Sequence, residues 1–592
     1  MHEEWITGGT SSLHWSAGGR AAEGLPGVRV GQGCRARVVA DDRARIAVVG
    51  DVVLLPGEEE GLLRSAAEGQ WASLTRLTGS YWVVAQTRAH SFVCGDLSGL
   101  RGVFYSGSHG PHILWSTSAR RLAQHLGAAP DLAMVAARLA AGPEHWPDST
   151  AYEHVLAVPP GNGLLLGADR PELVDVVGTE PVSTLAQGAP AFGDALRRAV
   201  AWRMREAGGL ASADVSGGLD SSAVAVLAAR EGEVRAVTYA DEFTSTEDLH
   251  FARKVAEHIG TRLHVGNGGP GELPFGWSPS QPVTEQPAAL SLTTAQHALY
   301  LKPAAGLPLH FTGNGGDIVL DSCSAAWIGM VQRGDRRAAH RQVTDWARAR
   351  NLAPRELWRA VTQAAGNSHP GALENAAARL IRGEIEGRRP GVWTWCHMGQ
   401  FAAWLTPQGR EEVAILLREA ASRSDAYAEA DLTEQRSSLR LVGADARETA
   451  PLAASWRIRQ VHPYLDNQVV RAAFAIAPAE RHGVATFKPL LATALPFLPP
   501  WLTSRTSKGS FSRQLTAGLL HHRPALATLI STSPLVAGGL LDPDPALRAL
   551  AGIGGARSDA LYDIQRLIMS CQWLARIRPV ESESESESES AC

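Results

Sequence analysis

The segment Ser216–Ser222, which reads Ser-Gly-Gly-Leu-Asp-Ser-Ser, constrains the fold more than any other part of this 592-residue chain. It follows a short run of small and apolar residues, Leu210–Val215, that predicts a buried strand despite Asp214. It precedes Ala223–Arg230, whose composition predicts a helix. This geometry holds phosphates, because the glycines let the backbone approach a ligand and the N–H groups at the helix start face its negative charge.

Asp220 is the unusual member of this loop, because a carboxylate repels phosphates unless a divalent cation lies between them. Mg²⁺ is held by one or two carboxylates together with phosphate oxygens. The loop lacks the lysine of the Gly-x-x-x-x-Gly-Lys-Ser/Thr motif, so transfer of a γ-phosphate is not implied. The sequence therefore predicts a nucleotide-pyrophosphate site with Mg²⁺, whereas the alternative is a plain turn. The other candidate binding residues in the loop are Ser216, Gly217, Gly218, Ser221 and Ser222.

Composition narrows the class of protein. A chain of 592 residues is too long for one core, so two or more domains are expected. The net charge of −4 leaves no basic footprint for nucleic acid. The six cysteines form no Cys-x-x-Cys pair, which argues against a zinc site and a disulfide framework. With no signal-peptide pattern and no long apolar run, we expect a cytoplasmic protein that does not bind a membrane.

Residues 1–185 predict a mixed α+β domain built in layers. Short apolar or alternating runs predict strands at 46–55, 79–85 and 90–94, the last two pairing as a hairpin. Helical stretches lie between the strands, at 60–69, 118–126 and 133–140. A loop-like segment, Pro181–Pro190, marks the predicted domain boundary.

Residues 191–578 begin with alternating helices and strands, which predicts a parallel sheet with crossover helices. The predicted strands are 210–215, 234–239, 262–265 and 309–312. Ligands bind at the carboxyl ends of such strands, so Thr238 and Tyr239 are further candidate nucleotide contacts. The chain from about 325 is mostly helical by its pattern. Residues 579–592, a Glu-Ser repeat closed by Ala591-Cys592, predict a disordered tail.

A second glycine-rich loop, Gly313–Asp317, follows the fourth predicted strand of the same sheet. Asp317 supplies a second carboxylate that can share Mg²⁺ with Asp220, and Gly315 lets the backbone approach the nucleotide. Lys508 lies in a Ser/Thr/Gly loop with Arg505, a setting that on its own indicates solvated surface. Adenylation chemistry nevertheless requires a positively charged side chain where oxyanions develop. The choice of Lys508 for this role depends on resemblance to a known family, not on the chemistry of the loop alone.

Several motifs together resemble one family. The first loop is similar to the Ser-Gly-Gly-x-Asp-Ser loop of PP-loop ATPases, which convert ATP to AMP and pyrophosphate while adenylating a substrate oxygen. Three later segments resemble asparagine synthetases and β-lactam synthetases: Gly313–Asp317, His462–Asp466, and Phe487–Leu491 followed by Arg505 and Lys508-Gly509. Two earlier segments resemble a class II glutaminase domain: Leu77–Trp82 and Gly95–Tyr105.

The resemblance implies a class II glutaminase-like domain over 1–185 and an α/β PP-loop ATPase domain with large helical additions over 191–578. It also implies ATP and Mg²⁺ as cofactors, Asp220 and Asp317 as metal ligands, and Lys508 as the essential lysine of the C-terminal segment. His2 stands where such glutaminases place their cysteine nucleophile, and the Asn-Gly-Glu segment is replaced near Val49-Gly50-Asp51. Without ammonia from glutamine, the enzyme is expected to use an amine already present on its substrate.

Two relatives close an amide in this way, the β-lactam synthetases and the lasso peptide cyclases. The double glycine Gly315-Gly316, the Trp-rich helical region with Trp404–Pro407, and the chain length favour the cyclases. The expected reaction adenylates an Asp or Glu side chain of a precursor peptide, and the N-terminal amine of the peptide then closes a macrolactam.

The resemblance also implies a leader-binding protein and a leader peptidase as partners. The alternatives are a β-lactam synthetase that acts on a small β-amino acid, an ammonia-using synthetase, and a non-catalytic homologue. Asn314 departs from the relatives and cannot act as a base, so the group that takes the amine proton is left open.

Overall fold

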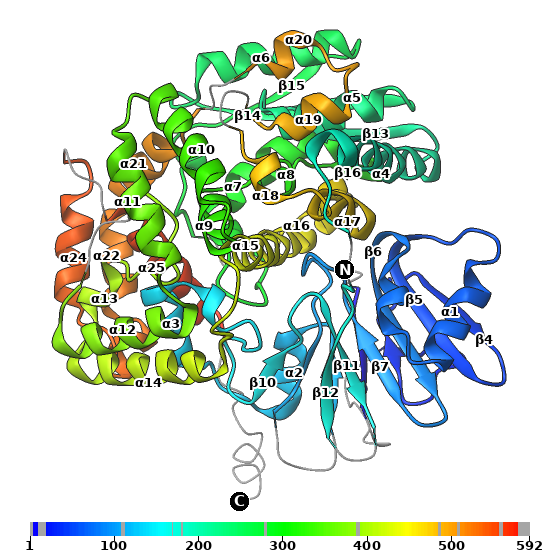
Figure 1. Cartoon of the computed structure of the whole chain (residues 1–592), viewed down its shortest axis with the longest axis horizontal. Coiled ribbons are helices and arrows are strands. Elements are labelled where there is room, and N and C mark those ends of the chain that lie inside the picture. The colour runs from blue at the N-terminus through cyan, green and yellow to red at the C-terminus, as the bar shows by residue number, and fades with distance from the viewer. Residues whose placement is uncertain are drawn as a thin grey trace, which may run out of the picture.

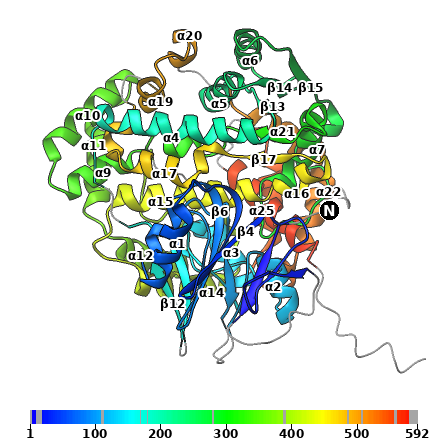
Figure 2. The same cartoon turned by 90° about the vertical axis from the view of Figure 1, so that its right-hand side faces the viewer.

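The structure, a computed structural model, describes most of the chain. The described residues are 4–9, 19–107, 113–167, 170–178, 181–277, 281–385, 391–483, 487–505, 509–555 and 560–577. Two antiparallel sheets form one end of the molecule, a parallel sheet lies at the other, and helices fill one flank (Figure 1). Figure 2 shows the long helix α4 (Leu185–Glu206) running across the molecule between these parts.

The N-terminal part contains two six-stranded sheets, in the orders β10-β8-β9-β1-β3-β2 and β12-β11-β7-β6-β5-β4. Their strands are β1 Ile6–Gly9, β2 Arg20–Ala21, β3 Arg29–Val30, β4 Ala36–Ala40, β5 Ala44–Val53, β6 Thr78–Thr87, β7 Ser91–Cys94, β8 Phe104–Ser106, β9 Leu114–Ser116, β10 Val155–Ala157, β11 Asn162–Leu166 and β12 Pro171–Asp175. Helices α1 (Glu58–Ala67), α2 (Ala119–Leu126) and α3 (Leu132–Ala141) lie between them. The predicted strands and helices of this region are confirmed, including the hairpin of β6 and β7.

The centre of the second of these sheets is buried on both faces. Trp82 and Val84 of β6 pack with Ile6 and Trp115 of the first sheet. Tyr81 and Val83, which point the other way, join the large core that continues into the rest of the molecule. The sequence of a strand that is buried on both sides is a continuous apolar run rather than an alternation of apolar and polar residues, and β6 has such a sequence.

The C-terminal part is built around a five-stranded sheet in the order β15-β14-β13-β16-β17, and every neighbouring pair is parallel. The strands are β13 Leu210–Asp214, β14 Glu233–Ala240, β15 Leu263–Asn267, β16 Leu309–Phe311 and β17 Arg459–Val461. The crossover helices are α5 Leu219–Ala229, α6 Thr246–His258 and α7 Leu290–Leu301, and the short α8 (Gly316–Val319) follows β16. The predicted parallel sheet is confirmed, with β17 as an additional strand.

The rest of the chain is helical, as predicted. Its helices are α9 Ala325–Gln332, α10 Arg336–Ala349, α11 Pro354–Ala365, α12 His369–Arg382, α13 Phe401–Trp404, α14 Pro407–Arg423, α15 Ala430–Arg447, α16 Ala450–Ser455, α17 Asn467–Phe474, α18 Pro478–Arg481, α19 Pro489–Ala494, α20 Pro500–Thr503, α21 Ser512–His521, α22 Arg523–Ser531, α23 Pro534–Ala537, α24 Pro543–Gly552 and α25 Leu561–Leu574. Residues of α3 share one apolar core with α14 and α25, so the N-terminal part is embedded in this region. Among the described residues, no helix is both long and apolar enough to cross a membrane.

The prediction of a loop over Pro181–Pro190 is wrong. Helix α4 begins at Leu185, and Pro190 lies inside it. Thr184 caps this helix by accepting a hydrogen bond from the Gln187 backbone N–H, while the Gln187 side chain accepts from the Thr184 backbone N–H. This reciprocal capping box fixes the helix start early enough for the helix to include the proline.

Candidate active site

The first glycine-rich loop joins β13 to α5 at the carboxyl edge of the parallel sheet. Ser216 and Ser221 close the loop on itself, with their hydroxyl oxygens 2.9 Å apart. Gly217 has a φ of +81°, and a Cβ there would clash with the carbonyl oxygen of Asp248 in α6. Glycine is required at this position both by backbone conformation and by space.

The second glycine-rich loop lies directly against the first. A Cβ added to Gly313 would lie 2.6 Å from the backbone nitrogen of Ser221, and one added to Gly316 would overlap the Asp220 side chain. The two loops therefore touch through their backbones, as expected for the ends of the adjacent strands β13 and β16. This contact brings Asp220 and Asp317 to the same place.

Lys488 joins the two loops. Its Nζ lies 2.6 Å from both carboxylate oxygens of Asp220 and 2.6 Å from one oxygen of Asp317. The lysine side chain is 3% exposed, whereas that of Asp317 is 61% exposed and faces open space. A buried cation thus holds two carboxylates that belong to separate loops.

The backbone of Lys488 is in the left-handed region, with a φ of +50° immediately before Pro489 at the start of α19. A non-glycine residue pays conformational free energy there, and the residue before a proline normally prefers extended backbone. Burial acts to lower the pKa of Lys488, but the Asp220 and Asp317 carboxylates outweigh it and raise this pKa above its ordinary value. The ammonium therefore stays charged at neutral pH.

Arg505 adds a second buried positive charge at the first loop. Its guanidinium donates to the carbonyl oxygen of Gly217 and to the carboxylate of Asp248. The other oxygen of Asp248 accepts from the backbone N–H of Gly509, at 3.0 Å. Arg505 therefore fixes the position of the phosphate loop relative to α6.

A cavity of about 550 Å³ opens over both loops. Its walls include the candidate residues Ser216, Gly218, Asp220, Ser221, Thr238, Tyr239, Gly315 and Asp317. Gly217 and Ser222 do not line it: the Gly217 carbonyl is bound by Arg505, and the Ser222 side chain is buried. Lys508 and His2 lie outside the described residues, so their predicted roles remain predictions.

Lys488 and Arg505, by contrast, line the cavity. The role of Lys488 was not predicted, although its segment was noted for resemblance. Lys488 is 268 residues from Asp220, so no local spacing connects them.

The wall that faces α7 carries a chain of hydrogen bonds. Asp214, at the end of β13, lies 2.9 Å from Nε2 of His310, and Nδ1 of His310 lies 2.9 Å from the Ser212 hydroxyl. Asp214 lines the cavity, whereas His310 and Ser212 are fully buried. A carboxylate held in this way at a cavity wall can accept a proton.

The two carboxylates fit a Mg²⁺ ion bound together with nucleotide phosphates. Both already contact a single cation, the Lys488 ammonium, so their oxygens converge. The described residues contain no cluster of three or more His, Cys, Asp or Glu side chains that would form a complete metal cage. Mg²⁺ needs no such cage, because it keeps several waters and takes phosphate oxygens as ligands. Asp220 and Asp317 would hold the ion, which offsets phosphate charge.

Residues 191–575 match the profile of the asparagine synthase family. The chain belongs to this family. The match covers the parallel sheet, both glycine-rich loops and Lys488. Enzymes of the family use ATP, commonly with Mg²⁺. A comparison with curated proteins gives no match.

Two solved structures show a weak likeness. The first is glutamine phosphoribosylpyrophosphate amidotransferase from B. subtilis in complex with ADP and GMP, with 13% identity over 38% of this chain and a TM-score of 0.17. The second is described as the allosteric regulatory enzyme of purine biosynthesis, with 12% identity over 46% of this chain and a TM-score of 0.16. This chain spans about half the length of these structures, 47% and 54%, and such scores support no conclusion about fold or function.

Proposed function

We propose that this member of the asparagine synthase family is a macrolactam-forming ligase that makes a lasso peptide. It adenylates an Asp or Glu side-chain carboxylate of a precursor peptide, with release of pyrophosphate. The N-terminal amine of the same peptide then displaces AMP and closes the ring. The observation that carries the proposal is the buried lysine that joins two carboxylate-bearing glycine loops, in a chain whose N-terminal domain has no accessible described thiol.

The N-terminal domain supports an acceptor other than ammonia. Its described cysteines, Cys34 and Cys94, are both buried. Burial raises the pKa of the Cys94 thiol to about 12, and burial together with Glu4 raises that of Cys34. Nucleophilic attack on glutamine requires an accessible thiolate, so neither cysteine can supply it.

Asp51 also supports an acceptor other than ammonia. It lies in the segment that replaces the substrate-binding Asn-Gly-Glu of the resembling glutaminases. In the structure Asp51 is buried and pairs with Arg459 of β17, with Arg101 and Arg203 each 3.9 Å away. The side chain is thus committed to holding the two domains together rather than to binding a small ligand.

In the proposed reaction, the phosphates of ATP lie over Ser216–Ser222, at the N-terminus of α5. Lys508, the lysine of the resembling C-terminal segment, is proposed to stabilise the negative charge that develops on the acyl centre and the α-phosphate. Lys488 holds Asp220 and Asp317 in place. Because amine and acyl group belong to one molecule, ring closure gains from an effective concentration far above that of a free amine. Asp214, held by His310 at the cavity wall, is our candidate for the group that takes the amine proton. A leader-binding protein and a leader peptidase are proposed to prepare the peptide.

The test uses the full chain with ATP, Mg²⁺ and linear leaderless peptides that carry one Asp or Glu. Mass spectrometry is expected to show loss of one water, and ATP–pyrophosphate exchange is expected to depend on the peptide. Exchange that occurs with small β-amino acids and not with any peptide would instead identify a β-lactam synthetase. Product formation from free ammonium without an internal amine would overturn the proposal.

The substitution Asp214→Asn distinguishes the adenylation step from the ring-closing step. The variant is expected to keep peptide-dependent ATP–pyrophosphate exchange, because that step needs no proton acceptor, while ring closure slows by about 10²–10⁴-fold. Equal loss of exchange and of closure would assign Asp214 a structural role.

A further inference from the structure

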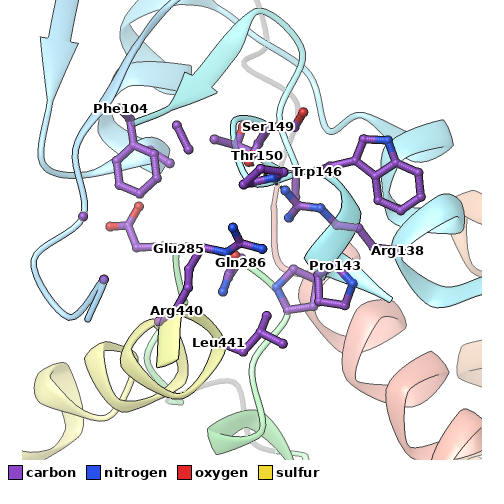
Figure 3. Close-up of a pocket in the computed structure, with 18 of the residues that line it drawn as sticks. Phe104, Arg138, Pro143, Trp146, Ser149, Thr150, Glu285, Gln286, Arg440 and Leu441 are labelled. Atoms are coloured by element: carbon purple, nitrogen blue, oxygen red, sulfur yellow. Dashed lines mark hydrogen bonds between the residues drawn. The ribbon is translucent and has the colours of Figure 1, made fainter. Parts of the chain in front are cut away.

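A second cavity, of about 180 Å³, lies between the N-terminal domain and the helical region (Figure 3). Its wall includes Arg138 of α3, Arg440 of α15 and Arg566 of α25, together with apolar side chains such as Trp146 and Leu441. The proposed reaction makes no use of this cavity. A fourth arginine of the wall, Arg447, pairs with Glu448 at 3.2 Å. Arg138, Arg440 and Arg566 are the three that need an explanation, since unpaired buried charge is costly.

None of these three arginines forms a salt bridge with a carboxylate of the described residues. Arg138 donates to the carbonyl oxygen of Ser149 at 2.7 Å, and its buried Nε has no partner there. Arg440 donates to the carbonyl of Glu144 at 3.0 Å. Arg566 donates to the carbonyls of Leu139 and Arg138. Backbone carbonyls satisfy some N–H groups but do not neutralise the charge.

The nearby carboxylates are engaged elsewhere or lie too far away. Glu285, which also lines the cavity, accepts from the Ser118 hydroxyl at 2.6 Å and from the Arg120 backbone N–H at 2.8 Å. Figure 3 shows its carboxylate turned toward Phe104, away from the guanidinium groups. Asp148 pairs with Arg423 at 3.8 Å. Glu144 acts on Arg440 only over a longer distance.

Arg138 and Arg440 point toward each other from opposite sides of the cavity (Figure 3). Burial, together with the charge of Arg440, lowers the pKa of Arg138 to about 10, and burial lowers the pKa of Arg440 to about 10. Two like charges that face each other in a space of low dielectric repel strongly. An anion between them would convert this repulsion into two attractive contacts.

The cavity is separate from the candidate active site. Val442 lines the active-site cavity, while Arg440 and Leu441 line this one. At about 100° per residue, Val442 lies on nearly the opposite face of α15 from Arg440. The two cavities are therefore divided by one helix, about 10 Å across.

We propose that this cavity is a binding site for a carboxylate group, held between Arg138 and Arg440. The planar guanidinium fork matches a carboxylate through paired, charge-assisted hydrogen bonds. The apolar walls around Trp146 and Leu441 fit an aliphatic or aromatic side chain next to that carboxylate. The ligand is thus the C-terminal residue of a peptide or a small free acid, and both sources share this chemistry.

Binding is tested without ATP on the full chain, so the result stands whether or not ring closure is observed. The probes are N-acetyl-Ala-Leu with a free carboxyl terminus and the same dipeptide as its amide, titrated by calorimetry. The acid is expected to bind at least about tenfold more tightly than the amide, as a charge-assisted pair implies. Equal binding of acid and amide by the wild-type chain overturns the proposal without any variant.

Single arginine substitutions test whether the acid binds in this cavity. Arg440→Gln is expected to reduce binding of the acid to the level of the amide, and Arg138→Gln provides a second variant if the first does not fold. Arg436→Gln is the matched control, because Arg436 is an exposed arginine on the same helix. Loss of acid binding in Arg436→Gln equal to that in Arg440→Gln overturns the proposal.

Titrations with acetate and inorganic phosphate distinguish the two sources of the bound anion, a peptide carboxyl terminus and a small free acid. If they bind with the same dependence on Arg440, a free small oxyanion is the ligand. If only the dipeptide acid binds, the site takes a peptide carboxyl terminus, and in the cyclase this would be the tail of the precursor.

Discussion

At the scale of single residues, Lys488 holds the active site together. Its left-handed backbone costs about 1–3 kcal/mol, a cost that persists only where surrounding contacts over-determine the conformation. Here those contacts are the carboxylates of Asp220 and Asp317. The strain therefore places one ammonium group between two loops that otherwise repel each other.

Replacing Lys488 by methionine keeps the length of the side chain and removes its charge. We expect ATP-dependent product formation to fall by about 10²–10³-fold, because Asp220 and Asp317 lose the cation that holds them together and the site loses positive charge. Steady-state kinetics would measure the effect, with Arg436→Gln as the control that removes an exposed positive charge. A Lys488→Met enzyme with wild-type kcat/KM would contradict the assignment.

His462 makes stability depend on pH. Burial, together with the charges of Arg101 and Arg203, lowers its pKa to about 3. The unfolded chain, in which this pKa is near 6.5, binds a proton first as pH falls. The contribution of His462 is therefore fully present above pH 6.5 and is lost progressively as pH falls from 6.5 toward 3.

His462→Gln removes this proton linkage and retains a group that can bond to the Thr312 hydroxyl. Between pH 7.5 and pH 5, the wild type is expected to lose about 2 kcal/mol more in free energy of unfolding than the variant. Chemical denaturation at both pH values measures the difference. Parallel losses in the two proteins would show that His462 titrates normally.

At the scale of elements, the site depends on two strand-to-helix loops that pack backbone against backbone. The contact leaves no space for a side chain at Gly313, because the backbone of Ser221 is too close. Adjacent parallel strands place the loops side by side, and the glycines permit them to touch.

Gly313→Ala is expected to force the loops apart, lowering stability by about 1–3 kcal/mol and reducing activity together with it. Gly61→Ala is the matched control, since that glycine lies in α1 with open space around it. The control should be stabilised by about 0.5–1 kcal/mol, as alanine is the better helix former. Thermal unfolding and activity assays test both, and a Gly313→Ala enzyme with unchanged activity would exclude the tight contact.

Sequence patterns predicted the elements that have strong local signals. The strand, loop and helix around Asp220 and the loop of Asp317 follow from glycines and apolar runs within a few residues. Strand β17 was missed because Arg459–Val461 is only three residues long and largely polar. Lys488 was missed because its importance arises from contacts across 268 and 171 residues, and no local pattern reports a left-handed lysine before proline.

At the scale of the whole molecule, a buried ion network joins the two domains. Asp51 from the N-terminal sheet meets Arg459 and Arg203 of the C-terminal part. Arg203 in turn forms a two-bond pair with the fully buried Asp466, at 2.8 and 2.7 Å. Burial acts to raise the pKa of Asp51, but Arg459, Arg203, Arg101 and Arg35 outweigh it and lower this pKa, so the carboxylate stays ionised.

Asp51→Ala is expected to lower the free energy of unfolding by about 3–5 kcal/mol, because it leaves buried arginines without their counter-charge. Asp42→Ala, at an exposed position in the same domain, should change it by less than about 0.5 kcal/mol. Chemical denaturation provides the measurement. If both variants lose equally little, the network does not hold the domains together.

The same network has a consequence for how such enzymes can be recombined. A chimera that fuses this N-terminal half to the catalytic half of another protein would bury Asp51 without Arg459 and Arg203 of this chain. The N-terminal half therefore depends on its own catalytic half for the counter-charges of Asp51. Such a chimera keeps this ion network only if its new catalytic half presents arginines at the positions of Arg459 and Arg203.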